Sequence, residues 1–238
     1  MFPHSIPLYR SEPHPCPYLE ARQTEDEIIY ASRPGGAVYQ VLMDFRFRRS
    51  GPMVYRPICS DCHECIPIRV PVDHFSPSRS QRRVMRRNKD IHVKVDVPEC
   101  TEEKWRIYSD YLERQHDGSM DAGFSAFEEY LYCSPTDTME MTYRLGERVV
   151  AVGILDVCPN SLSTVYFYFD PAEAQRSLGT YGALCEIEEC RHRKLAYWYV
   201  GFYIRGCGRM SYKVNFRPYE LLGRDGVWRP GRDADNTR

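Results

Sequence analysis

Residues 162–182 have the sequence LSTVYFYFDPAEAQRSLGTYG, and this stretch decides which fold is predicted. The first eight residues are rich in β-branched and aromatic side chains and predict a long strand. Asp170 and Pro171 end that strand, and a glycine-containing turn then opens a predicted helix over 178–194. Such a turn at a helix N-terminus exposes backbone N–H groups to an anion or a carbonyl oxygen. The glycines equally suit a helix that needs small residues where it crosses a sheet.

The elements predicted around this stretch follow the order β-β-β-α-β-α-β. Two strands over 138–145 and 148–157 come before it, separated by a turn at Gly146. Farther upstream the pattern predicts a strand over 91–97 and helices over 101–115 and 125–132. After the central helix come a strand over 196–203, a short helix near 205–213 and a strand over 215–222. Strands and helices of this order in a chain of 238 residues predict an α+β fold.

The first 75 residues follow a less regular pattern. Residues 1–35 are rich in proline and polar side chains and predict an irregular arm. Alternation over 38–48 (VYQVLMDFRFR) predicts a strand, and a turn at 50–52 allows residues 53–56 to pair back as a hairpin. An extended run follows at 66–72. We therefore expect a smaller cysteine-containing N-terminal domain over 1–75 and a larger domain over 76–238.

Three of the ten cysteines, Cys59, Cys62 and Cys65, stand at two-residue spacing. This spacing lets successive thiolates turn toward one metal ion. Cys16 is the best candidate for a fourth ligand, because the irregular arm can fold back, and His63 is a weaker one. Zinc and an iron–sulfur cluster both suit four thiolates. The alternatives for this cluster are a redox pair or cysteines that only pack in the core. Packing in the core is the role we expect for the other six cysteines of the chain.

Charge is unevenly distributed along the chain. The total of 32 basic and 33 acidic residues gives a net charge of −1, which alone argues against a nucleic-acid-binding protein. Residues 46–94 nevertheless carry +8, and they include a predicted basic helix over 78–89. Like charges on one helix face repel, so an anionic partner such as RNA is expected, and a solvated surface helix is the alternative. The arginines that share this face are Arg79, Arg82, Arg83, Arg86 and Arg87.

The element order and the glycine turn resemble the fold of the GNAT acyltransferases. A more extensive resemblance is carried by two long phrases, VYRPICSDCHECIPIRVPVDHFSPSRSQRRVMRRN at 54–88 and LGTYGALCEIEECRHRKLAYWYVGFYIRGCGRMSYKVNFRPYELL at 178–222. They resemble the N-terminal and C-terminal signatures of the bacterial aspartate/glutamate leucyltransferases, which belong to the arginyl-tRNA–protein transferase-like family. The sequence Cys-Pro-Tyr-Leu at 16–19 also matches in place. The larger domain is therefore expected to be a GNAT-like aminoacyltransferase domain that includes the basic helix.

The resemblance implies an enzyme whose donor is an aminoacyl-tRNA and whose acceptor is a protein N-terminus. The bacterial branch moves leucine from Leu-tRNA to an N-terminal Asp or Glu, which creates a destabilising N-terminus and leads to degradation. Related enzymes move arginine instead. The wider family associates its N-terminal cysteines with a metal or iron–sulfur site. The spacing at 59–65 departs from the paired adjacent cysteines of the eukaryotic relatives, so the type of site stays open.

The implied chemistry needs no covalent nucleophile and no cofactor, because an aminoacyl ester is already activated. The acceptor amine must be deprotonated and held in line with the ester carbonyl. Backbone N–H groups at Ser177, Gly179 and Thr180 are candidates for binding the oxyanion.

Recognition of an acidic N-terminal side chain calls for arginine, which binds carboxylates through two parallel hydrogen bonds. The candidates are Arg48, Arg49 and Arg56, for which contact with tRNA or a surface position is an equal alternative. Strands 164–169 and 197–203 can line an apolar pocket for the leucyl group. The terminal adenine of tRNA needs a stacking surface, and its phosphates or the oxyanion need a cation. The candidates for these contacts are Tyr181, Gly182, Tyr199, Tyr203 and Lys213.

Two functions of other classes agree with parts of the sequence. An acetyl-CoA-dependent GNAT-like acetyltransferase is disfavoured, because the turn lacks the usual basic-x-x-Gly-x-Gly/Ala spacing. A non-catalytic RNA-binding metal module does not explain the acyltransferase-like second half. The sequence has no run of 18 apolar residues, and residues 1–5 do not begin a signal peptide, so we expect a cytoplasmic protein without a membrane segment.

Overall fold

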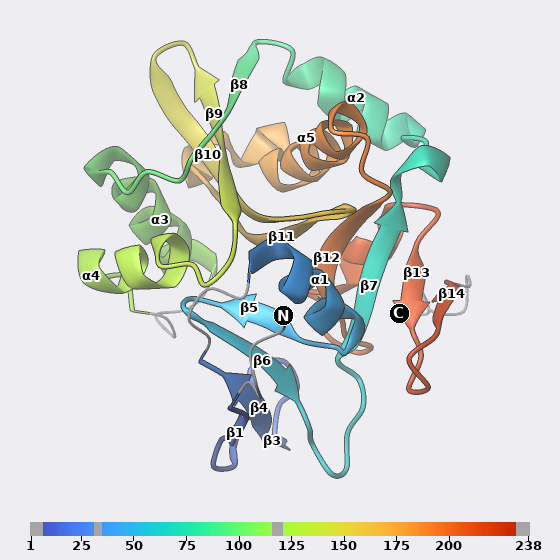
Figure 1. The fold of residues 1–238 in the computed structure, drawn as a ribbon. Helices are drawn as coiled ribbons and strands as arrows, with labels where there is room; N and C mark the ends of the chain where they lie inside the picture. Colours follow the sequence, from blue (N-terminus) through green and yellow to red (C-terminus); the bar gives the residue numbers. More distant parts are fainter. Residues whose placement is uncertain (1–6, 31–34, 116–120, 232–238) are drawn as a thin grey trace.

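An eight-stranded sheet forms the centre of the protein in a computed structural model, which describes residues 7–30, 35–115 and 121–231 (Figure 1). The strand order is β14-β13-β7-β12-β11-β10-β9-β8. Neighbours are antiparallel except β11 and β12, which run parallel because α5 connects them. The strands are β7 (Ile66–Pro71), β8 (Ile91–Asp96), β9 (Thr138–Leu145), β10 (Arg148–Cys158), β11 (Ser161–Phe169), β12 (Tyr197–Tyr203), β13 (Glu220–Leu222) and β14 (Trp228–Pro230).

Helices cover both faces of this sheet, which explains why β10 is buried at nearly every position. Val150 and Leu155 of β10 face the core shared with α5 (Leu178–His192) and α2 (Arg79–Arg87). Val149 and Val152 face the core shared with α3 (Glu102–Gln115), α4 (Phe124–Phe127) and the π-helical turn η2 (Glu128–Tyr132). Figure 1 shows α5 and α2 together above the sheet and α3 and α4 at its left.

A second sheet, β1-β4-β6-β5, lies at the lower end of the molecule, and α1 (Gly35–Asp44) packs between it and β10 (Figure 1). Tyr39 and Met43 of α1 are buried against Tyr199 of β12. The eight-stranded sheet extends across the division expected at residues 75 and 76, because β7 belongs to it. The N-terminal strands are β1 (Tyr9–Arg10), β2 (His14–Pro15), β3 (Gln23–Thr24), β4 (Asp26–Ile29), β5 (Arg48–Ser50) and β6 (Met53–Pro57).

The predicted strand over 38–48 is wrong, because most of this segment is helix α1. Its buried residues, Gly36, Tyr39 and Met43, recur every three or four positions, which is a helical period. Gly36 also explains how the helix fits, since a Cβ there would lie 2.2 Å from the carbonyl oxygen of Val157. The arm predicted as irregular contains β1 to β4 in its described part, and residues 1–6 and 31–34 lie outside the description.

The remaining short elements differ in extent from the prediction. The helix expected near 205–213 is a 3₁₀ turn, η4 (Ser211–Asn215), and the last predicted strand shrinks to β13. Two further 3₁₀ turns are η1 (Val72–His74) and η3 (Pro171–Arg176). The longer strands, the helices α2, α3 and α5, and the α+β class are confirmed. No helix in the described part of the chain has the length and apolar character needed to cross a membrane.

Candidate functional site

The candidate site is a gap between β11 and β12. The two strands pair only from Ser161 to Ser163 on β11 and from Tyr197 to Tyr199 on β12. Immediately after this pairing each strand shifts register against its other neighbour, at Val165 in β11 and Val200 in β12. Such bulges bend strands apart and are frequent beside active sites. The separation leaves a cavity of about 200 Å³, called here the strand-gap cavity.

Cationic and phenolic side chains dominate the walls of the strand-gap cavity, and no Asp or Glu is among its lining residues. The cations are Arg48, Arg49 and Lys213. Because all three are buried, their charges are weakly screened by solvent and favour an anion in the cavity. The other polar and aromatic lining residues are Tyr18, Tyr39, Tyr55, Tyr130, Tyr166, Phe202, Ser50, Ser163 and Thr164.

Arg49 is already neutralised by a carboxylate from the large sheet. Its Nε donates to both oxygens of Asp156 at 3.0 Å, and both side chains are fully buried. Its Nη1 donates to the carbonyl oxygen of Gly51 at 2.9 Å, and Thr138 donates to Asp156 at 2.9 Å. Arg49 therefore joins β5 to β10 and carries little net charge toward a ligand.

Arg48 forms no ion pair with a carboxylate of the described residues. Its Nη1 donates to the carbonyl oxygens of Phe47 at 2.6 Å and Met43 at 3.3 Å, while its buried Nε and Nη2 have no hydrogen-bond partner in the described part of the chain. Its guanidinium carbon lies 5.4 Å from the ring of Tyr199 and 5.5 Å from the ring of Phe202. Burial lowers the pKa of Arg48 from its usual value, but a guanidinium remains charged at neutral pH. Buried donors without a partner need an explanation, and an anion bound in the cavity would supply one.

Lys213 adds a second cation whose charge depends on pH. Its Nζ donates to the carbonyl oxygen of Phe202 at 2.7 Å, and Gly201 leaves room for it, because a Cβ there would lie 3.5 Å from Nζ. Burial lowers the pKa of Lys213 to about 7, and the positive charge of Arg48 acts in the same direction. An anion bound between them would favour the protonated form of Lys213.

The structure does not bring Arg56 together with Arg48 and Arg49. Its Nε donates to Glu27 at 2.6 Å, and its guanidinium lies 4.7 Å from the ring of Phe47. The tyrosines predicted to stack on adenine are also differently placed, because Tyr181, Tyr199 and Tyr203 are all at most 6% exposed. They offer no free ring face in this structure.

The glycine turn before α5 lies outside the strand-gap cavity. None of Ser177, Gly179, Thr180, Tyr181 and Gly182 is among the residues lining that cavity or the cysteine cavity described below. A Cβ at Gly182 would lie 2.1 Å from Phe167, so this glycine is required where α5 crosses β11. Gly179 has open space around it, and the first N–H groups of α5 remain available to a ligand that approaches from outside.

Sequence reasoning did not identify Thr164, Glu186 and Trp198, which meet beside the gap. Glu186 is 1% exposed, and it accepts hydrogen bonds from the Thr164 hydroxyl and from Nε1 of Trp198. A glutamate within the otherwise apolar run ALCEI at 183–187 was the available signal. Burial raises the pKa of Glu186 to about 7.

The four cysteines of the predicted metal site line one cavity of about 200 Å³, called here the cysteine cavity. The β2–β3 hairpin places Cys16 beside Cys59, Cys62 and Cys65, as expected for an arm that folds back. Burial and the three neighbouring thiols raise the pKa of Cys65 to about 12. Among the described residues, no three His, Cys, Asp or Glu side chains converge closely enough to hold an ion. The donor chemistry thus suits a thiophilic metal, and its binding would require the side chains to move inward.

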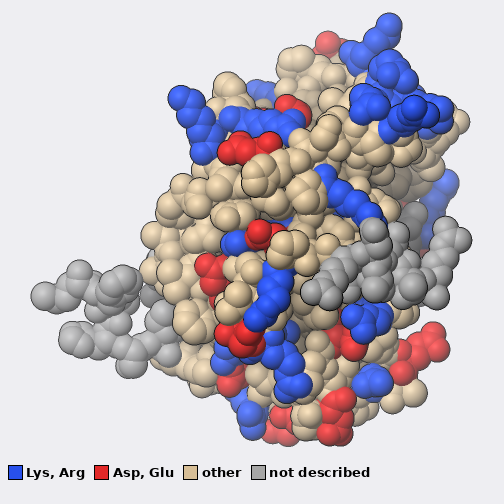
Figure 2. Space-filling view, turned by 90° about the vertical axis from the view of Figure 1, so that its right-hand side faces the viewer, with Lys and Arg blue, Asp and Glu red and all other residues tan. Residues whose placement is uncertain are grey.

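Helix α2 presents the predicted arginine stripe to solvent. The helix begins with a capping box in which Ser78 and Gln81 satisfy each other's backbone N–H groups. Val84 and Met85 pack on the core, and all five arginines are exposed on the other side. None of the five forms an ion pair within the described ranges, although Arg82 and Arg87 donate to the backbone oxygens of Pro77 and Gln175. Figure 2 shows basic side chains gathered at the top of the molecule, at the height of α2 in Figure 1.

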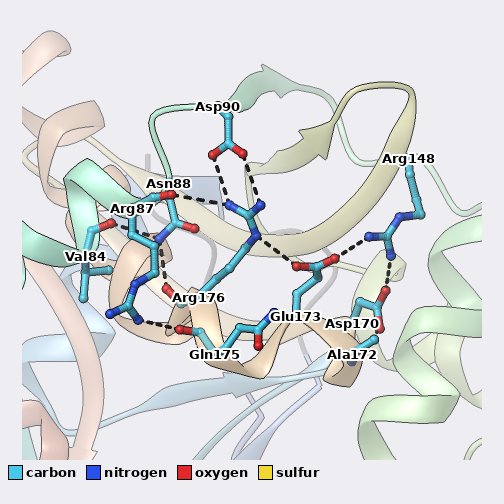
Figure 3. A network of polar contacts seen from close by, with 10 residues as sticks. All are labelled: Val84, Arg87, Asn88, Asp90, Arg148, Asp170, Ala172, Glu173, Gln175 and Arg176. Carbon is cyan, nitrogen blue, oxygen red and sulfur yellow. Dashed lines mark hydrogen bonds and ion pairs between the residues drawn. The ribbon is translucent and has the colours of Figure 1, made fainter.

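A network of charged residues ties the end of α2 to the loop before α5 (Figure 3). Arg176 donates to both oxygens of Asp90, at 3.0 and 3.1 Å, and to Glu173 at 2.9 Å. Arg148 bridges Glu173 and Asp170 on the other side. The backbone takes part as well, since Asn88 donates to the carbonyl oxygen of Arg176 at 2.9 Å. The arginine stripe and the N-terminus of α5 are therefore held in a fixed relation.

Family models and curated relatives match this sequence along nearly the whole chain. Residues 14–83 match the family model for the N terminus of arginine-tRNA-protein transferases, and residues 103–223 match the model for their C terminus. The chain is 38% identical over 220 residues to the aspartate/glutamate leucyltransferase of Pseudomonas savastanoi pv. phaseolicola, covering 91% of this chain and 94% of the relative. It is 39% identical, with the same coverage, to the protein of the same name from Pseudomonas aeruginosa.

A solved structure shares the fold at low sequence identity. It is the C-terminal domain of a protein from Agrobacterium fabrum named as a lysylphosphatidylglycerol synthetase. The TM-score is 0.50 at 12% identity, and the match covers 69% of this chain and 58% of that one.

We predict that Arg48→Met abolishes anion binding in the strand-gap cavity without lowering stability. Removing a buried cation that lacks a carboxylate should leave the free energy of unfolding unchanged or raise it by about 1 kcal/mol. Glutarate should raise the melting temperature of the wild-type protein and not that of the variant. Arg56→Met, which removes a cation outside the cavity, is the control and should keep the response. An equal response to glutarate in Arg48→Met would contradict the assignment.

Proposed function

The chain belongs to the arginine-tRNA-protein transferase family, and from that membership we propose that it transfers leucine from Leu-tRNA to the N-terminal Asp or Glu of acceptor proteins. The names of its relatives support this donor and these acceptors. The unpaired donors of Arg48 are the observation that carries the acceptor assignment, because they suit a carboxylate in a cavity without acidic lining residues. The product is a destabilising N-terminus, and a cytoplasmic location, where aminoacyl-tRNA is present, agrees with this role.

The proposed reaction exchanges an ester for an amide. The acceptor α-amine attacks the leucyl carbonyl carbon, a carbon–nitrogen bond forms, and the bond to the ribose oxygen of tRNA breaks. The ester supplies the driving force, so the protein has to position the two substrates, stabilise the oxyanion and transfer protons. In this arrangement Arg48 binds the acidic side chain of the acceptor, Arg49 holds β5 in place, and Lys213 in its protonated form assists in binding negative charge.

The tRNA is proposed to lie along α2. Five exposed arginines without acidic partners among the described residues suit the negative charge of a phosphate backbone. The network in Figure 3 holds this stripe against the loop that leads into α5, and the exposed N–H groups of that helix are available to the terminal nucleotides.

The proposed function predicts label transfer from [¹⁴C]Leu-tRNA to peptides that begin with Asp or Glu. Peptides that begin with Asn or Gln test the carboxylate, and an N-acetylated Asp peptide tests the free amine. These three should accept at least about tenfold less label, because each loses a charged contact or the nucleophile. Transfer from Arg-tRNA alone would identify an arginyltransferase, and acetylation from acetyl-CoA would identify an acetyltransferase. Absence of all three products would reject the proposal.

The stripe predicts that Arg82→Glu combined with Arg86→Glu weakens tRNA binding. Affinity at low salt should fall at least about tenfold, and the slope of log K against log salt should decrease in magnitude by about 2. The matched control is Arg106→Glu with Arg114→Glu, which makes the same charge change on exposed positions of α3. Equal binding by the two double variants would remove α2 from the tRNA interface.

We propose further that the cysteine cavity holds a structural zinc ion or iron–sulfur cluster through Cys16, Cys59, Cys62 and Cys65. Freshly purified protein should contain metal in a fixed ratio to chain, and visible absorption would distinguish a cluster from zinc. Cys62→Ser should lose the metal, whereas Cys133→Ser, at an exposed position elsewhere, should keep it. Metal-free protein, or equal metal in both variants, would leave the four cysteines with a packing role.

A further inference from the structure

Glu186 is buried without a cation. It projects from α5 toward the sheet, where a Cβ on Gly153 of β10 would lie 3.3 Å from its Oε1. Its Oε2 accepts a hydrogen bond from Nε1 of Trp198 at 2.9 Å and a short one from the Thr164 hydroxyl. No Lys or Arg pairs with it in the part of the chain that the structure describes. The other fully buried acids differ, since Asp156 pairs with Arg49 and Glu140 pairs with Lys104 at 2.6 Å.

Thr164 connects this carboxyl group to the strand-gap cavity. It is half-buried, it lines the cavity, and it directly precedes the bulge at Val165. Its hydroxyl donates to Glu186 and accepts from Nε1 of Trp198 at 2.9 Å, which leaves one lone pair for a ligand. A proton that reaches this hydroxyl from the cavity can therefore be passed on to Glu186 within one hydrogen bond.

The buried surroundings of Glu186 bring its pKa close to neutral pH. Burial raises its pKa to about 7, although the hydrogen bonds from Thr164 and Trp198 act in the opposite direction. The titratable groups that interact with it are Tyr143 of β9, Tyr212 of η4 and, on its own helix, Cys185 and Cys190. Burial raises the pKa of Tyr143, Cys185 and Cys190, and Tyr212 is a half-exposed phenol with an ordinary pKa of about 10, so all four are neutral at pH 7. Glu186 is the member of this group that changes charge there.

We propose that Glu186, acting through the Thr164 hydroxyl, takes the proton that the acceptor α-amine loses when it attacks the leucyl ester. This inference rests on the proposed function and supplies the proton acceptor for it. As the carbon–nitrogen bond forms, an amine proton moves to Thr164 Oγ1 and the Thr164 proton moves to Glu186. As the bond to the ribose oxygen breaks, Glu186 returns its proton to Thr164 Oγ1, and the Thr164 hydroxyl gives the proton it took from the amine to that oxygen. The enzyme ends unchanged, and Glu186 is a positioning residue because it acts through Thr164.

A pH profile of leucyl transfer tests the relay. In the wild-type protein kcat should rise with pH around a midpoint near 7, because only ionised Glu186 accepts a proton. Glu186→Gln should lower kcat at pH 7.5 by about 100-fold, with a smaller change in KM, and should remove this midpoint. Thr164→Val should have the same effect, and Thr164→Ser should restore the rate and the midpoint.

Matched variants separate this role from packing. Thr142→Val removes another hydroxyl that donates to a buried glutamate, Glu140, at 2.7 Å, and should leave kcat and its midpoint unchanged. Lys213→Met tests the other group near neutral pKa. Loss of the midpoint in Lys213→Met with its retention in Glu186→Gln would overturn the relay, and so would a wild-type profile in Thr164→Val. Should Glu186→Gln fail to fold, the pair Thr164→Val and Thr164→Ser decides the question.

An optical titration distinguishes failure of the relay from failure of the proposed function. Trp198 donates to the Glu186 carboxyl, so its fluorescence should change with a midpoint near 7 in the absence of any substrate. The change should disappear in Glu186→Gln. A titration without transfer activity in the wild-type protein would reject the leucyl-transfer function alone. Wild-type transfer activity with no titration near pH 7 would reject the relay alone.

Discussion

The buried ion pair between Arg49 and Asp156 joins the N-terminal sheet to the eight-stranded sheet, and the strand-gap cavity depends on it. Neither side chain is exposed, so removing one partner would leave an uncompensated charge in the interior. The pair fixes β5 beside β10, and the adjacent residue Arg48 is thereby placed at the cavity wall. One wall of the site thus comes from the N-terminal sheet and the others from β11, β12 and η4.

The neighbouring arginines show how the same residue type takes opposite roles. Arg49 has a carboxylate at 3.0 Å and one unpaired donor, Nη2, whereas Arg48 has only backbone oxygens as partners among the described residues and keeps two donors unpaired. A buried cation without a counterion lowers the stability of the folded chain, and it strengthens the binding of a ligand that supplies the charge. Glu186 is the acidic counterpart, held behind the cavity by Thr164 and Trp198 without a cation. An unpaired buried charge at either position makes the folded chain less stable than an ion pair or an apolar side chain there would. Such positions are typical of functional sites.

The surface that faces the proposed tRNA is rigidly linked to the remainder of the site. Ion pairs and backbone hydrogen bonds join α2, η3 and the beginning of α5, as Figure 3 shows. Helix α5 carries Glu186 in its third turn, so the arginine stripe, the helix N-terminus and the proton acceptor belong to one unit.

Local periodicity was sufficient to predict the long elements. The strands β8 to β12 and the helices α2, α3 and α5 agree with the prediction because their segments are rich in β-branched and aromatic residues or carry apolar positions at helical spacing between clear turn and cap signals. The segment at 38–48 was misassigned because apolar side chains occur on both sides of a short stretch, and only packing against β10 selects the helix. Likewise, the glycine at 182 was compatible with a binding turn or a close helix–sheet contact, and Phe167 decided for the contact.

The sequence by itself determined the family, the arginine stripe and the grouping of four cysteines, because these are encoded in contiguous phrases and fixed spacings. Only the tertiary structure decided which of the three candidate arginines lines the cavity without a carboxylate paired to it. Arg49 is neutralised by Asp156, 107 positions away, and Arg56 by Glu27, 29 positions away. Arg48 has no such carboxylate among the described residues and is left unpaired. The role of Glu186 was likewise hidden, since its pKa is set by burial in the folded protein and not by its neighbours in the chain.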